Sequence, residues 1–261
     1  MINKEEFDFS LNSTFSYKHT FSTSICSLFL KGKSCLVYCV DNNIIIHEFF
    51  SNKKDILLKG HTETVLYIIQ LENNNLVSAS EDSTIKFWSI NDYNCILTLK
   101  GHEDWVIFLL EINNNLLASC SIDGYLKIWD IKKQSCLYNF THDEEWVNCI
   151  VKIKEGIICS CGDDYKIKFW DYEKGIFLYE IKNDIGINII EKINDNLIIS
   201  YDKKFKIKVW NINNKEKCYE IQTKYNNVTN LFNINDNRIA IICENYDILI
   251  FDYDNKLIIK V

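Results

Sequence analysis

The chain has 261 residues, of which 47% are hydrophobic, 25% are charged and 13% are aromatic, and its formal net charge at pH 7 is -7. This composition is typical of a globular protein, and the acidic balance argues against direct nucleic-acid binding, for which a basic domain is the usual signature. No run of about 18 apolar residues is present, so we expect no transmembrane helix and no membrane partner. Residues 1–6 also lack the apolar segment of a secretory signal. The sequence therefore predicts an intracellular protein, cytoplasmic or nuclear.

A unit of about 41 residues recurs along the chain, and an aromatic residue closes each of its last five copies. The closing residues are Trp88, Trp129, Trp170, Trp210 and Phe251, at intervals of 41, 41, 40 and 41 residues. One further step of 41 residues back from the first of them reaches His47 and gives a sixth copy. A period of roughly 40–45 residues is typical of β-sheet units arranged around an axis.

Each copy is expected to form four short strands. In the second copy they are predicted at 65–69, 76–80, 84–90 and 95–99, where β-branched and aromatic residues dominate. The chain has no proline and only 8 glycines, so its turns must depend on Asn and Asp. We expect a single domain over residues 1–261. Its six units are predicted at about 19–58, 59–99, 100–140, 141–181, 182–222 and 223–261, preceded by an N-terminal strand within 1–18.

Three features of these copies resemble the WD40-repeat family. A Gly-His pair opens copies two and three, an Asp lies six residues before the closing Trp, and Trp-Asp ends copies three and four. The resemblance is strongest in copies two to four and weaker in the others. It implies an all-β fold, a WD40-like β-propeller of about six four-stranded blades around a central channel.

In that family a His, a Ser or Thr, the turn Asp and the Trp form a hydrogen-bonded tetrad within a blade. The resemblance implies three such tetrads here. They are His61, Ser78, Asp82 and Trp88; His102, Ser119, Asp123 and Trp129; and His142, Ser160, Asp164 and Trp170. Ser80 and Ser121 are alternative hydroxyls. Because the set repeats at one spacing, we interpret it as structural rather than catalytic, and we predict no enzymatic activity.

Copies one, five and six depart from this pattern. In copy five Ser200 and Trp210 remain, but Lys204 stands where the turn Asp is expected. We expect these three blades to lack the full tetrad.

The 11 cysteines do not point to a metal site or to disulfides, because their number is odd and no Cys-x-x-Cys is present. Cys95, Cys136 and Cys218 recur in one position of the repeat, which predicts packing in the core. The histidines are one blade apart and too distant from one another to share a metal. We expect no metal and no cofactor.

Two tryptophans lie outside the closing position. Trp105 and Trp146 are one repeat apart, and the resemblance places them on the top face of the propeller, beside the channel. Acidic residues are predicted on the same face: Glu63, Glu81, Glu103, Asp104, Glu144, Glu145 and Asp163. Such a surface favours a Lys- or Arg-bearing peptide. The alternatives are that the indoles pack against neighbouring blades and that the acidic loops are simply solvated.

The sequence predicts a non-catalytic protein-interaction scaffold within a multiprotein complex. One alternative is a subunit whose open ring is completed by another chain. Another is an adaptor of the ubiquitin-ligase type, although Arg238 is the only arginine and a phosphate-binding arginine cluster is therefore impossible.

Closure of the ring has two readings. Both 13–18 and 257–261 resemble the fourth strand of a blade, so one of them is surplus in a closed six-bladed ring. We expect the closed ring. The alternative is an open ring with unpaired strand edges.

Overall fold

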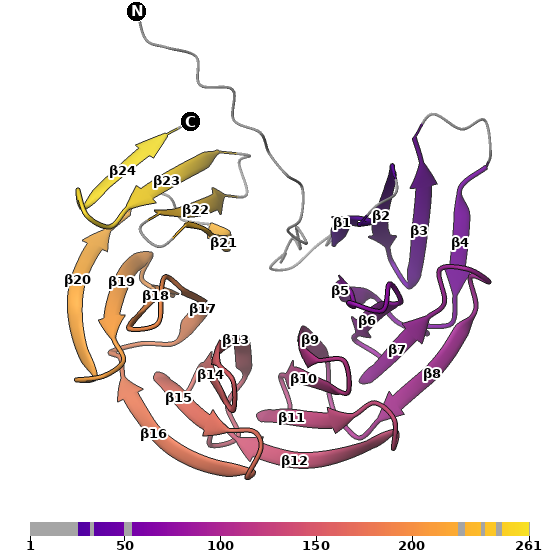
Figure 1. The fold of residues 1–261 in the computed structure, drawn as a ribbon, viewed down its shortest axis with the longest axis horizontal. Coiled ribbons are helices and arrows are strands. Elements are labelled where there is room, and N and C mark those ends of the chain that lie inside the picture. The colour runs from indigo at the N-terminus through magenta and orange to yellow at the C-terminus, as the bar shows by residue number, and fades with distance from the viewer. Residues whose placement is uncertain are drawn as a thin grey trace, which may run out of the picture.

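The computed structural model describes residues 26–31, 34–49, 54–223, 228–235, 238–243 and 247–260. These residues form 24 strands and no helix. The strands assemble into six antiparallel sheets of four consecutive strands each. Figure 1 shows the sheets side by side around a centre, with the first strand of each sheet inside and the fourth at the rim. The prediction of an all-β, WD40-like propeller with six four-stranded blades is confirmed.

The sheets follow one another in chain order. Sheet one consists of β1 (Ser27–Phe29), β2 (Cys35–Val40), β3 (Asn43–Glu48) and β4 (Ile56–Lys59); sheet two of β5 (Val65–Gln70), β6 (Leu76–Ser80), β7 (Thr84–Trp88) and β8 (Cys95–Lys100); and sheet three of β9 (Val106–Asn113), β10 (Leu116–Ser121), β11 (Tyr125–Asp130) and β12 (Ser135–Thr141). Sheet four consists of β13 (Val147–Lys154), β14 (Ile157–Gly162), β15 (Lys166–Asp171) and β16 (Ile176–Lys182); sheet five of β17 (Ile187–Lys192), β18 (Leu197–Asp202), β19 (Lys206–Asn211) and β20 (Glu216–Gln222); and sheet six of β21 (Val228–Asn235), β22 (Arg238–Cys243), β23 (Ile248–Asp252) and β24 (Leu257–Lys260).

Apolar cores lie between consecutive sheets. All five residues of β6 are buried, because this strand is covered on both faces. The closing tryptophans join these cores: Trp88 shares a cluster with residues of sheet one, and Trp129 shares one with residues of sheet two. The fourth strands are mostly exposed because they lie at the rim. For this reason the expectation of buried cysteines at the start of that strand is wrong for Cys95, Cys136 and Cys218.

The turn between the second and third strands of a sheet is stabilised by an Asp side chain, so it does not need a proline. In sheet two, Asp82 accepts a hydrogen bond from the N–H of Thr84 at its Oδ1 (2.9 Å), and Ser83 between them has a left-handed backbone. Gly124 fills the same position in sheet three, whereas sheets four and five place Tyr165 (φ 65°) and Phe205 (φ 62°) there. Bulky residues are uncommon in this conformation.

Polar side chains near the end of the innermost strands tie each sheet to the preceding one. The carboxylate of Glu111 accepts the N–H of Glu72 at 3.0 Å, and the ammonium of Lys192 donates to the carbonyl of Ile153 at 2.6 Å. At least one such bond crosses each boundary between consecutive sheets. The bridging residues are Gln70, Glu111, Lys152, Lys192 and Asn233.

Sheets one and six lie at the two ends of the arc that the described residues form (Figure 1). Large apolar side chains are exposed in both, including Phe29 and Val40 in sheet one and Ile234 and Ile248 in sheet six. β24 is the fourth strand of sheet six. The expected N-terminal strand at 13–18 lies outside the described residues, so closure of the ring by that segment stays a prediction.

Candidate functional site

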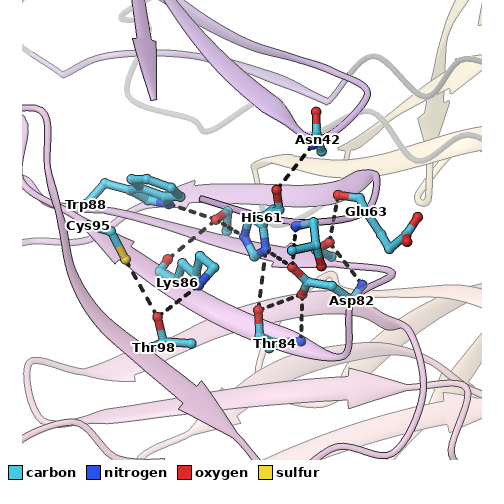
Figure 2. A network of polar contacts seen from close by, with 12 residues as sticks. Asn42, His61, Glu63, Asp82, Thr84, Lys86, Trp88, Cys95 and Thr98 are labelled. Atoms are coloured by element: carbon cyan, nitrogen blue, oxygen red, sulfur yellow. Dashed lines mark hydrogen bonds and ion pairs between the residues drawn. The ribbon is translucent and has the colours of Figure 1, made fainter. Parts of the chain in front are cut away.

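The structure brings together all four residues of the second copy. The imidazole of His61, in the loop before β5, lies with Nε2 2.7 Å from Oγ of Ser78 and with Nδ1 2.8 Å from Oδ2 of Asp82. Nε1 of Trp88 donates to the same Ser78 hydroxyl at 2.8 Å. Figure 2 shows His61 between the turn of Asp82 and the end of the strand that carries Trp88.

Sheet three repeats this geometry. His102 lies 2.7 Å from Ser119 and 2.7 Å from Asp123, and Trp129 donates to Ser119 at 2.8 Å. The backbone N–H of Glu103 also donates to Asp123 at 3.0 Å. The four side chains form one continuous chain of hydrogen bonds that joins the entering loop, the turn and two strands.

Sheet four contains the same residues, and here a lysine side chain contacts the carboxylate. Ser160 bonds both His142 (2.7 Å) and Trp170 (2.8 Å). Nδ1 of His142 lies 3.0 Å from Oδ2 of Asp164 without the alignment of a hydrogen bond. Nζ of Lys168 lies 3.0 Å from the same oxygen. An ion pair with this lysine therefore supports the carboxylate here.

The protonation states of His61 and Asp82 follow from their burial and from their hydrogen bonds. Burial lowers the pKa of His61, and the attraction of Asp82 only partly opposes this effect. Burial by itself would raise the pKa of Asp82, but hydrogen bonds from Thr84, the N–H of Thr62 and His61 outweigh it and hold that pKa below its ordinary value. The consistent arrangement is a neutral imidazole whose Nδ1–H donates to the carboxylate and whose Nε2 accepts the Ser78 proton.

The same atoms resemble a hydrolase triad, but their surroundings differ from those of a nucleophile. Ser78, Ser119 and Ser160 are completely buried, and each accepts an indole N–H. No substrate can reach these hydroxyls. The alternative hydroxyl of Ser80 instead donates to the carbonyl of Glu63 at 3.1 Å, so it lies outside the tetrad. Ser121 makes the equivalent bond to Asp104.

A second group of predicted residues lies at the end of the propeller where the loops that enter the first strands meet the turns between the second and third strands. We call this end the loop face. Trp146 is 39% exposed on it, whereas Trp105 is half-buried. Glu81 is half-buried and the other carboxylates without an ion-pair partner in the described residues are exposed: Glu63, Glu103, Asp104, Glu144 and Glu145. Asp163 differs, because it pairs with Lys203 at 2.5 Å.

The family model described as WD domain, G-beta repeat, matches residues 52–89, 93–130 and 134–171. The chain contains three WD40 repeats. Each match contains one of the three tetrads, and together the matches cover less than half of the chain. None of the curated proteins compared with the sequence matches it. WD40 repeats generally mediate protein interactions and are generally non-catalytic.

The fifth WD40-like blade contains a buried ion pair that sequence reasoning missed. Trp210 donates to Ser200 at 2.8 Å, as in the other blades. Asp202, two residues before the expected position, lies 3.1 Å from Nζ of Lys208, and both side chains are almost fully buried. Asn183 accepts from the same ammonium at 2.5 Å. The available signal was Lys208 itself, which occupies the position of Lys168 one repeat earlier.

The described part of this WD40-repeat protein contains no group of three His, Cys, Asp or Glu side chains placed to hold a metal ion. No helix there could cross a membrane.

Proposed function

We propose that this WD40-repeat protein is a non-catalytic intracellular scaffold that binds a Lys- or Arg-bearing segment of a partner protein on its loop face. The observation that carries the proposal is unbalanced negative charge beside an exposed indole. Glu144 and Glu145 are exposed next to Trp146 and form no ion pair within the residues that the structure describes. A cationic segment would find complementary potential and an aromatic face at one place.

The geometry favours Trp146 over Trp105 as the centre of this surface. Trp105 is half-buried, which suits packing within the blade. Trp146 combines exposure with a large ring, and such residues supply much of the binding energy at protein interfaces. Sheets two to four contribute the surrounding carboxylates, so a partner would cross several blades.

Binding of a defined cationic peptide tests the proposal. A fluorescein-labelled nonapeptide of alternating glycine and arginine is expected to bind the full chain, measured by fluorescence anisotropy, with an affinity that falls as salt is added. Trp146→Ala should weaken binding about fivefold, because it removes the aromatic face. The matched control is Tyr93→Ala, an equally exposed aromatic in the turn between β7 and β8 at the opposite end of sheet two. Equal affinity of the wild type and Trp146→Ala would refute the proposed site.

A second candidate function is a subunit whose open ring is completed by another chain. The exposed apolar residues of sheets one and six favour it, because these two sheets lie at the ends of the arc, where another chain would add (Figure 1). The chain alone should then self-associate in sedimentation velocity, and Phe29→Asp combined with Ile248→Asp should reduce this association. A stable wild-type monomer would contradict this candidate.

A further inference from the structure

Lys203 makes an unusual contact across the boundary between sheets four and five. It lies in the turn between β18 and β19, and its Nζ is 2.5 Å from Oδ2 of Asp163 in sheet four. The same atom lies 5.8 Å from the centre of the Trp146 ring. A carboxylate and an aromatic face are the two groups that a partner's lysine or arginine would contact.

Trp146 and Asp163 are held in place independently of Lys203. The backbone N–H of Asp163 donates to the carbonyl of Trp146 at 2.9 Å. The buried amide of Asn148 donates to Oδ1 of Asp163 at 2.8 Å and to the carbonyl of Ile187 at 3.0 Å. Removal of Lys203 would therefore leave the Asp163 carboxylate and the backbone of Trp146 in position.

Two of the chain's 8 glycines make room for this arrangement. A Cβ at Gly162 would lie 2.2 Å from the carbonyl oxygen of Trp146. A Cβ at Gly186 would lie 3.0 Å from the Asp163 carboxylate and 3.2 Å from the aliphatic stem of Lys203. Side chains at these positions would displace both halves of the contact.

The arrangement does not recur at the neighbouring boundary. There the N–H of Ile122 bonds the carbonyl of Trp105 at 3.1 Å, as Asp163 does to Trp146, so an apolar residue replaces the carboxylate. In addition, the residue of sheet four that occupies the same repeat position as Lys203 is Asp163 itself. The tetrads, which hold the blades together, recur from sheet to sheet. Within the described residues this polar contact occurs only at the boundary of sheets four and five, so the repeat itself does not require it.

We propose that Trp146 and Asp163 form a cation-binding clasp, which Lys203 occupies in the free chain and leaves when a partner's lysine or arginine enters. This inference rests on the proposed function and specifies its central contact. The Lys203 side chain is 42% exposed, so water can solvate its ammonium as it leaves. The lysine thus acts as an internal competitor that weakens binding of cationic segments.

The test measures the affinity of the glycine–arginine peptide for variants of the full chain. Lys203→Ala should bind it about tenfold more tightly than the wild type, since exposed cation–π and ion-pair contacts together are of that magnitude. The matched control is Lys174→Ala, which removes the same charge from an ion pair with Asp171 at the opposite end of sheet four. A gain in Lys203→Ala alone excludes a general effect of net charge.

The double variant Lys203→Ala/Trp146→Ala should lose the gain, and thermal unfolding should verify that every variant folds. If Lys203→Ala binds no better than Lys174→Ala while Trp146→Ala still weakens binding, the proposed function stands and the clasp is refuted. If Trp146→Ala has no effect in either background, the proposed function and the clasp both fail. Weaker binding by Lys203→Ala would show that Lys203 holds the two blades together and does not compete with the peptide, which would also refute the clasp.

Discussion

Trp129→Ala is expected to lower the free energy of unfolding by about 3–5 kcal/mol, the range for large aromatic residues truncated in a core. Its indole is 2% exposed and shares an apolar cluster with Val77 and Phe87 of sheet two. The substitution would leave a cavity between two sheets and remove the indole donor of Ser119. Urea unfolding followed by circular dichroism measures the change.

Trp146→Ala is the matched control for this prediction. It deletes the same side chain from a position that is 39% exposed, so the expected loss is less than about 1 kcal/mol. Similar losses for the two variants would show that the closing tryptophan is not a main element of the packing between sheets. A large loss for Trp146→Ala alone would also remove the basis for using it as a binding variant.

The stability of the chain is expected to fall as the pH is lowered below about 6.5, the ordinary pKa of histidine. Burial lowers the pKa of His61, His102 and His142 in the folded chain. Below about 6.5 the unfolded chain therefore binds more protons than the folded one, and acid favours unfolding. Each histidine contributes up to about 1.4 kcal/mol per pH unit between its folded and unfolded pKa values.

The tetrad carboxylates extend this trend to lower pH. Despite burial, hydrogen bonds hold the pKa of Asp82 and Asp123 below the ordinary value, so their stabilisation is present above about pH 4 and is lost as the pH falls through the folded values. Urea midpoints measured from about pH 7.5 to about pH 3 test both effects, the histidines above about pH 4 and the carboxylates below it. His102→Gln, which cannot titrate, should reduce the slope below pH 6.5 by about a third, one histidine of three contributing. A midpoint that is constant or rises towards acid would contradict the prediction.

The repeat period predicted the sheets well because it depends on hydrogen bonds and packing between adjacent strands of one sheet. The Ser ten residues before each closing Trp bonds that Trp through adjacent strands, as Ser78 and Trp88 do. The end of β7 at Trp88 was less predictable, because Ser89 starts a turn by accepting the N–H of Asn91 at 3.3 Å. This turn shortens the strand expected at 84–90.

The contacts between sheets were not predictable in the same way. Lys203 and Asp163 are 40 residues apart, and their pairing depends on the side-chain directions in two different turns. Asp202 shows a related difficulty, since a carboxylate displaced by two residues pairs with Lys208 across the turn. A residue-by-residue repeat alignment assigns each position within a blade but gives no information on which side chains cross to the next one.

The bridging bonds between consecutive sheets have a mechanical consequence. Gln70 and Glu111 accept backbone N–H groups, whereas Lys152, Lys192 and Asn233 donate to backbone carbonyls, and every bond joins a sheet only to its predecessor. Such nearest-neighbour coupling makes a repeat protein behave as a one-dimensional array. Under a pulling force applied at the two ends, the blades should detach one at a time in discrete extension steps rather than yielding together.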